Sequence, residues 1–110
     1  MPKKAFVPEL YKKISVYDLI LFGVYSVNYK KEKCSYERLV KECFILFPKS
    51  FSFFEMPDWP DARKLDRSLR TLRKKKMLTG DPRNVFALTK IGRKSAEDVG
   101  KIFRQGRLGL

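Results

Sequence analysis

The chain has 110 residues, 44% of them hydrophobic and 14% aromatic, which is enough for one domain with a modest core. It carries 25 Lys and Arg against 12 Asp and Glu, with no histidine and two cysteines. The missing histidine excludes the common imidazole base, Ser-His arrangements and His-containing zinc sites, and two cysteines are too few for a four-thiolate zinc site. No glycine-rich phosphate loop is present. We therefore expect no enzyme activity, no metal and no cofactor.

Targeting signals are absent from the sequence pattern. Pro8 and Glu9 interrupt any signal-peptide core near the N-terminus. The apolar run 16–27 contains Asp18 and is too short to cross about 30 Å of hydrocarbon. We expect a cytoplasmic protein with one domain, residues 15–104, between a basic N-terminal arm, residues 1–14, and a flexible C-terminal tail, residues 105–110.

The first half of the domain predicts two helices. Ser15 is a natural N-cap, and apolar residues at helical spacing predict a buried helix over 16–27. A second helix should begin at Ser35 and stop before Pro48, with Cys43 as a small core residue on its apolar face. Lys33 and Cys34 leave room for a very short strand between the two helices.

The segment from Pro48 to Pro60 is rich in proline and aromatic residues. It is too apolar for a free linker and too broken for a helix, so it predicts an ordered, packed connection. Its large apolar side chains either cap a small core, which we favour, or form an exposed patch for base stacking: Phe51, Phe53, Phe54, Met56 and Trp59.

A third helix should open at Asp58 or Trp59, with Pro60 in its first turn, and run to about Lys76. Its two faces differ sharply. One face is apolar and is predicted to pack on the core: Ala62, Leu65, Leu69 and Leu72. The opposite face carries a row of cations at helical spacing: Arg63, Arg67, Arg70 and Lys74.

A hairpin and a fourth helix should complete the domain. Asp81 and Pro82 suit the first two positions of a type I turn, and β-favouring residues on both sides predict paired strands. Thr89 is an acceptable N-cap for a helix from Lys90 to about Phe103. Four apolar residues of this helix are predicted to rejoin the core: Ile91, Val99, Ile102 and Phe103.

This order of elements is typical of a winged helix domain, and residues near its end add a resemblance. Leu88, Thr89, Gly92 and Ala96 form an LT-x-x-G-x-x-x-A pattern that resembles the segment closing the wing in MarR-like and PadR-like regulators. The stretch 51–96 is also similar to small winged helix domains found beside restriction and other defence genes. The resemblance implies an α+β, mainly α fold: a winged helix-turn-helix with a three-helix core, a two-stranded wing hairpin and a C-terminal fourth helix.

The resemblance also implies which residues touch DNA. The third helix would enter the major groove through Arg63, Arg67, Arg70 and Lys74, and the wing tip would contact the backbone or minor groove through Arg83 and Asn84. At the start of the fourth helix, Lys90, Arg93 and Lys94 are either backbone contacts or a solvated first turn. One departure from the family is the connection before the third helix, which is about ten residues long where three or four are usual.

Charge distribution favours nucleic acid as the partner. Residues 60–107 hold 15 Lys and Arg against 5 Asp and Glu, whereas residues 1–59 hold 10 against 7. An anionic membrane would need cations bordered by exposed large apolar residues, but here the leucines lie opposite the cations. We predict double-stranded DNA binding by a transcriptional regulator or a defence-associated protein, and we favour a homodimer over a monomer. The alternatives are a winged helix that docks an acidic protein, and RNA or ribosome binding.

Overall fold

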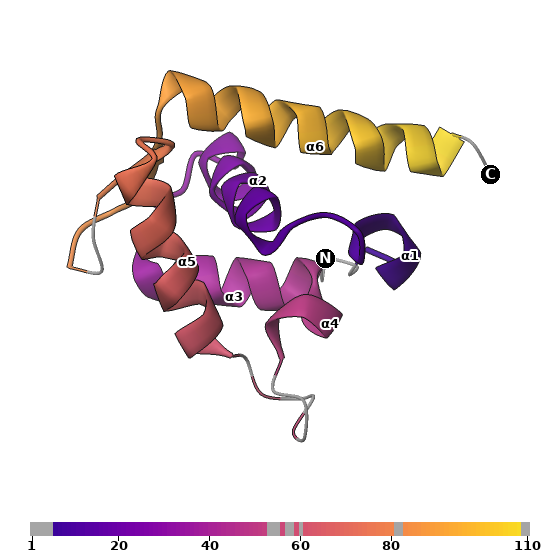
Figure 1. The fold of residues 1–110 in the computed structure, drawn as a ribbon, viewed down its shortest axis with the longest axis horizontal. Helices are drawn as coiled ribbons and strands as arrows, with labels where there is room; N and C mark the ends of the chain where they lie inside the picture. The colour runs from indigo at the N-terminus through magenta and orange to yellow at the C-terminus, as the bar shows by residue number, and fades with distance from the viewer. Residues whose placement is uncertain (1–5, 53–55, 57–58, 60, 81–82, 109–110) are drawn as a thin grey trace.

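The computed structural model describes residues 6–52, 56, 59, 61–80 and 83–108 of the chain. Within them it is mainly helical, with one small antiparallel sheet, as predicted (Figure 1). The elements in chain order are α1 (Pro8–Tyr11), α2 (Val16–Tyr29), α3 (Tyr36–Leu46), α4 (Pro48–Phe51), α5 (Ala62–Lys74), β1 (Leu78–Thr79), β2 (Ala87–Leu88) and α6 (Lys90–Leu108).

Helix α2 is the centre of the molecule, and it packs against α3, α5 and α6 (Figure 1). The predicted caps start both of the first long helices, since the Ser15 hydroxyl accepts the Asp18 N–H at 3.2 Å and the Ser35 hydroxyl accepts the Arg38 N–H at 3.2 Å. Cys43 is buried in the core between these helices, as expected. None of the described helices combines the length and the apolar character needed to cross a membrane.

Both ends of the chain contribute more to the fold than the sequence suggested. The segment predicted as a basic arm forms α1 and buries Tyr11. The Phe6 ring stacks on that of Phe103 with centroids 4.3 Å apart, and α1 packs against α6. With this support α6 continues to Leu108, beyond the predicted end at Phe103 and into the predicted tail.

The connection between α3 and α5 differs from the prediction in three ways. It contains a short helix, α4, which buries Phe51 in the core. Met56 and Trp59 are exposed, so the core-capping expectation is correct for Phe51 and wrong for these two; Phe53 and Phe54 lie outside the described residues. Helix α5 begins at Ala62, later than predicted, because the Asp61 side chain accepts the Lys64 N–H at 3.2 Å and acts as its N-cap.

A lysine in the left-handed conformation ends α5. Lys76 has φ 57°, its N–H donates to Arg73 C=O at 3.0 Å, and Met77 N–H donates to Leu72 C=O at 3.0 Å. These two bonds are those of a Schellman motif, a position at which glycine is the usual residue. Lys31, with φ 62°, ends α2 in the same way.

The predicted hairpin is present, with Leu78 opposite Leu88 and Thr79 opposite Ala87. Two residues of its turn, Asp81 and Pro82, lie outside the described part of the chain. No strand forms at the position expected for a short one, but Phe86 N–H donates to Cys34 C=O at 2.8 Å and ties the hairpin to the α2–α3 connection.

The LT-x-x-G-x-x-x-A segment joins the ends of α5 and α6. The Thr89 hydroxyl donates to Lys76 C=O at 2.7 Å and accepts the Gly92 N–H at 3.2 Å, which confirms Thr89 as the N-cap of α6. A Cβ on Gly92 would lie 1.9 Å from the Met77 oxygen, and Ala96 is fully buried. Glycine is therefore needed at position 92 because the chain there touches the Met77 carbonyl group.

Helix α6 joins the core through fewer of its apolar residues than predicted. Val99 and Phe103 are buried, but Ile91 and Ile102 are 61% and 48% exposed. Both isoleucines were expected to be in the core and are not. The buried residues Ala96, Val99 and Phe103 are three or four positions apart and form one stripe of α6, and the two isoleucines lie outside it.

Candidate nucleic-acid interface

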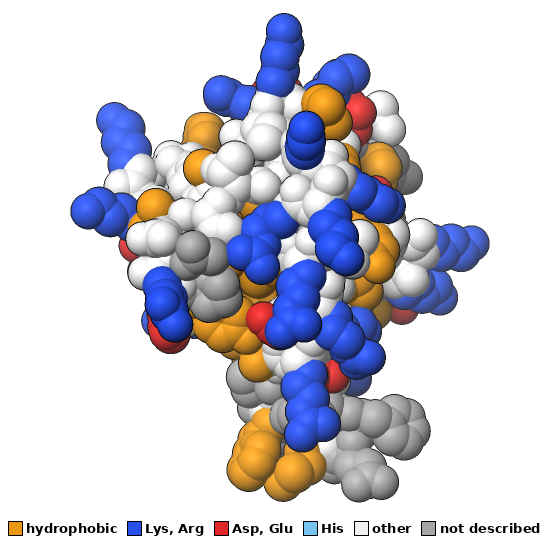
Figure 2. Space-filling view, turned by 60° about the vertical axis from the view of Figure 1, so that its left-hand side comes forward, with side chains coloured by type: hydrophobic (Ala, Val, Ile, Leu, Met, Phe, Trp, Pro, Cys, Tyr) orange, Lys and Arg blue, Asp and Glu red, His pale blue; other side chains and the backbone are white. Residues whose placement is uncertain are grey.

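The two faces of α5 are separated as predicted. Leu65, Leu69 and Leu72 are buried in the core, where the helix packs against α2. The four cations on the opposite side are all exposed: Arg63, Arg67, Arg70 and Lys74. Figure 2 turns this side of the molecule toward the viewer and shows Lys and Arg side chains along most of its height, with few Asp and Glu among them. We call these four residues the α5 cation row.

Three members of the α5 cation row have no acidic partner in the part of the chain that the structure describes. Among the described residues, no carboxylate oxygen lies within 4.0 Å of Arg63, Arg67 or Lys74. Arg70 differs, because its guanidinium lies 3.3 Å from the Asp66 carboxylate one turn earlier. That pair is exposed and contributes little to stability. The charge of the row is therefore not required for internal pairing.

Other cations of α5 have structural contacts that the sequence did not reveal. The Lys64 ammonium donates to Ser50 C=O at 2.8 Å, and an Arg73 guanidinium nitrogen donates to Gly80 C=O at 3.1 Å. Lys75, which follows the last residue of α5, places its ammonium 5.4 Å from the ring centroid of Tyr17. The run of cations at the end of α5 thus divides into residues that hold the fold and residues that face solvent.

The remaining predicted site residues lie on the hairpin and at the start of α6. Arg83 and Asn84 are exposed beyond β1, and Lys90 is exposed in the first turn of α6. Arg93 is exposed too and lies 4.0 Å from Glu97 on its own helix. The bond between Thr89 and Lys76 holds the first turn of α6 against the end of α5. Lys90 and Arg93 are thereby brought near one end of the α5 cation row.

Helix α3 holds a charged cluster that the sequence analysis missed. Glu42 is fully buried, and its carboxylate accepts hydrogen bonds from Ser26 at 2.5 Å, Lys30 at 2.9 Å and Arg38 at 2.8 Å. Arg38 also pairs with Glu32 at 2.8 Å. Burial alone would raise the pKa of Glu42, but these hydrogen bonds and the charge of Lys30 lower the pKa below its usual value. The spacing of Arg38 and Glu42, four residues apart with Glu42 inside the apolar stripe, was the available signal.

The two cysteine thiols are free and buried. Burial raises the pKa of Cys34 to about 12 and raises that of Cys43 well above its ordinary range. Such thiols stay protonated near neutral pH and lack the thiolate needed for nucleophilic or metal-binding chemistry. Within the described residues, no group of three or more Cys, Asp or Glu side chains is placed to hold a metal ion.

Comparison with known proteins adds no family to this description. No protein-family model, no curated protein and no solved structure matches the chain.

Proposed function

We propose that this protein is a winged helix domain that binds double-stranded DNA through the α5 cation row, as a transcriptional regulator or a defence-associated protein. The observation that carries the proposal is a set of exposed cations on a helix whose other face is anchored in the core. Arg63, Arg67 and Lys74 have no acidic partner among the residues that the structure describes. Net charge destabilises a compact chain by self-repulsion, so a row of exposed cations that is mostly unpaired supports a polyanionic partner.

The arrangement around the hairpin supports the winged helix part of the proposal. Three long helices precede the hairpin, and a helix follows it. The bond from Phe86 N–H to Cys34 C=O places the α2–α3 connection beside β2, where a winged helix has its third strand. The 15 residues from Phe47 to Asp61 that separate α3 from α5 are a departure, since a helix-turn-helix usually has three or four at this point.

Duplex DNA suits the geometry of α5. A helix fits the major groove, which is about 12 Å wide, and Arg side chains reach both phosphates and guanine edges. Because the buried leucines hold α5 on the core, its backbone needs no ordering on binding. Phosphate neutralisation would supply most of the affinity, with Arg83, Asn84, Lys90 and Arg93 as flanking contacts. In a homodimer, two copies of α5 would read half-sites about 34 Å apart.

A charge-matched pair of variants tests the proposal. Arg67→Glu/Arg70→Glu and Lys12→Glu/Lys13→Glu each change the net charge by four units, and all four side chains are exposed. Lys12 and Lys13 follow α1, on the opposite side of the molecule from α5 (Figure 1). We expect the α5 variant to lose duplex binding in fluorescence anisotropy and the α1 variant to keep most of it. Circular dichroism should show both folded.

Three results would overturn the proposal. Equal loss of affinity in the two variants would mean that net charge, not α5, drives binding. Preference for structured RNA over duplex DNA at equal nucleotide concentration would assign the same face to RNA. Capture of a specific acidic protein that survives nuclease treatment, without duplex binding by the purified protein, would assign it to a protein partner.

A further inference from the structure

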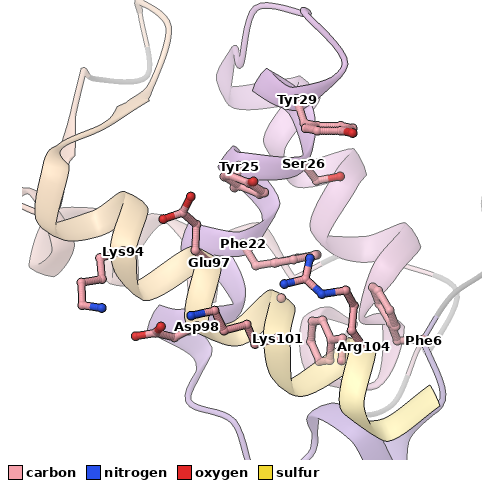
Figure 3. Close-up of a pocket in the computed structure, with 12 residues that line it drawn as sticks. Phe6, Phe22, Tyr25, Ser26, Tyr29, Lys94, Glu97, Asp98, Lys101 and Arg104 are labelled. Atoms are coloured by element: carbon pink, nitrogen blue, oxygen red, sulfur yellow. The ribbon is translucent and has the colours of Figure 1, made fainter. Parts of the chain in front are cut away.

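Tyr29 and Trp59 are the most exposed aromatic side chains among the described residues. Tyr29 is 79% exposed at the edge of a pocket of about 570 Å³ between α2 and α6 (Figure 3). Trp59 is 57% exposed in the connection between α4 and α5, and Met56 in the same connection is 46% exposed. Tryptophan is largely buried in most proteins, so an exposed one beside a second large apolar side chain marks a candidate binding surface.

The charges around Tyr29 do not favour a polyanion. Five charged side chains of α6 line the pocket, and they carry both signs: Lys94, Glu97, Asp98, Lys101 and Arg104. Figure 3 shows the acidic side chains among the basic ones along this helix. Phosphates at this pocket would meet carboxylates as well as cations, so its rings suit a nucleic acid poorly.

Trp59 has different surroundings, because it lies beyond one end of the α5 cation row. The connection that carries it projects past the start of α5, whose first cation of the row is Arg63 (Figure 1). Figure 2 shows hydrophobic side chains at this end of the molecule, directly below the Lys and Arg side chains. Cations beside an exposed aromatic ring are the arrangement that binds single-stranded nucleic acid, since the cations hold the backbone and the ring stacks on a base.

The connection between α4 and α5 is tied to the fold at its base. Asp61 N–H donates to the C=O of the buried Phe51 at 2.6 Å, and the bond from the Lys64 ammonium to α4 closes the same loop. Trp59 N–H donates to Met56 C=O at 2.9 Å, which forms a turn. These bonds set the position of the Trp59 backbone relative to α5, so less ordering is needed on binding.

Acidic residues near Trp59 favour contact with a base over contact with the backbone. Three lie close to it in the sequence: Glu55, Asp58 and Asp61. Glu55 and Asp58 are outside the described residues, and Asp61 caps α5. Carboxylates repel phosphates but do not oppose stacking on a neutral base. Because opening a paired base step costs unstacking energy, the ring reaches a base most easily where the strand is unpaired.

We propose that Trp59 stacks on an unpaired base where a duplex continues into a single strand, while the α5 cation row holds the duplex. The protein then prefers such a junction to a fully paired duplex. This inference rests on the proposed DNA binding and adds the form of DNA that the surface takes. Every base has a π-face, so the preference does not depend on which base is unpaired.

Three DNA probes test the proposal: a blunt duplex, the same duplex with a short thymine overhang, and the same duplex with an abasic overhang that has equal phosphates but no bases. Each overhang is made at the 3′ end and at the 5′ end. Anisotropy of labelled DNA measures the affinity of the full chain, and the emission of Trp59, the only Trp of the sequence, reports stacking. We expect a thymine overhang to bind about tenfold more tightly than the abasic one and to quench the emission.

Variants of Trp59 assign the effect to the ring. Trp59→Ala should remove the preference for the thymine overhang and leave the affinity for the blunt duplex unchanged. Trp59→Phe should keep part of the preference, because an aromatic ring remains. Ile102→Ala removes a similarly exposed apolar side chain from α6, at the opposite end of the molecule in Figure 1, and should change neither affinity. Circular dichroism should show all three variants folded.

The outcomes separate this inference from the proposed function. Binding of the blunt duplex with no gain from a thymine overhang of either polarity would overturn the inference and leave the proposed function in place. The inference is also wrong if the abasic overhang binds as tightly as the thymine overhang, because added phosphates then explain the gain. A preference that survives in Trp59→Ala would contradict it as well. Failure of the folded protein to bind any of the probes would overturn both.

Discussion

Helices α3 and α5 both carry arginine, but the two helices use it differently. On α3, Arg38 lies between Glu32 and the buried Glu42, with 2.8 Å to each carboxylate. On α5, Arg63 and Arg67 face solvent without an acidic partner among the described residues. Both helices bury one apolar face against α2 or its neighbours. The difference lies in what the charge does: on α3 Arg38 satisfies a buried carboxylate, whereas Arg63 and Arg67 on α5 make no ion pair with the described residues.

This comparison shows that the role of a cation depends on its partners more than on its position in a helix. A buried carboxylate without partners is costly, so the cations around Glu42 are needed for stability. An exposed cation can be replaced at little cost to the fold. The α5 cation row is therefore available for binding. Mutation of the charged residues around Glu42 should lower stability, whereas mutation of the α5 cation row should lower duplex affinity and leave stability unchanged.

The largest effect is expected at the buried carboxylate. Glu42→Ala leaves Lys30, Arg38 and Ser26 without their shared acceptor, and breaking a buried pair of this kind costs about 3 kcal/mol. Urea unfolding monitored by circular dichroism measures the loss. Glu37→Ala, on the exposed side of the same helix, is the control and should leave the unfolding midpoint near that of the wild type. Equal shifts of the unfolding midpoint in the two variants would contradict the stabilising role assigned to the cations around Glu42.

Acid should weaken the same cluster. The pKa of Glu42 is lower in the folded state than its ordinary value of 4.5. The stabilisation is thus fully present above that ordinary value and is lost as the pH falls through the lower folded pKa. Urea midpoints measured from pH 6 downward should fall below about pH 4.5, and this fall should be smaller in Glu42→Gln, whose amide does not titrate. A Gln variant with the wild-type acid profile would show that other carboxylates control it.

A glycine at the junction of α5 and α6 should be nearly as sensitive. Gly92→Ala would place a methyl group 1.9 Å from the Met77 oxygen and force the end of α5 away from α6. We expect a loss of about 1–3 kcal/mol, typical of overpacking. Gly100→Ala is the matched control, since its Cβ has room and alanine favours the helix by about 1 kcal/mol. Thermal melts of the two variants should shift in opposite directions.

Replacing one arginine from each helix tests the comparison directly. Arg38→Gln removes partners from Glu42 and Glu32 and should destabilise the fold by about 1.5 kcal/mol, less than Glu42→Ala because Ser26 and Lys30 remain. Arg67→Gln should leave the free energy of unfolding unchanged and reduce duplex affinity. Denaturant unfolding of both variants measures the change in stability, and fluorescence anisotropy measures the change in duplex affinity. A destabilised Arg67→Gln would mean that the α5 row has a structural role.

The smallest effect is a gain in stability. Lys76→Gly relieves the left-handed backbone at the end of α5 and should stabilise the protein by about 1 kcal/mol. Lys75, one residue earlier, has a negative φ that does not favour glycine, and its ammonium contacts Tyr17. Lys75→Gly should therefore destabilise the protein. Thermal unfolding distinguishes them. Destabilisation by Lys76→Gly would indicate that the lysine side chain stabilises the motif.

Local signals in the sequence located most of the secondary structure. The caps Ser15, Ser35 and Thr89 each act as the hydroxyl chemistry predicts, and the leucines of α5 face the core. The exposure of the α5 cation row also followed from helical periodicity, since residues opposite a buried stripe must face solvent.

Features set by distant contacts could not be read from the sequence. The length of α6 depends on Phe6, which lies almost the whole chain away from Phe103. The buried position of Glu42 depends on Ser26 and Lys30 of another helix. Trp59 looked like a core residue by composition, yet the start of α5 at Ala62 leaves it outside. These features depend on contacts between residues that are far apart in the sequence, and helical periodicity carries no information about such contacts.

The salt dependence of DNA binding tests the central claim most directly. Fluorescence anisotropy with a random-sequence duplex should give log K falling against log salt with a slope of about −4 to −5, as for about four to six neutralised phosphates. Arg63→Gln/Arg67→Gln should make that slope shallower by about 2 units while the protein stays folded. A folded wild type that fails to bind at low salt, or a double variant with the wild-type slope, would contradict the assignment of the α5 cation row to DNA.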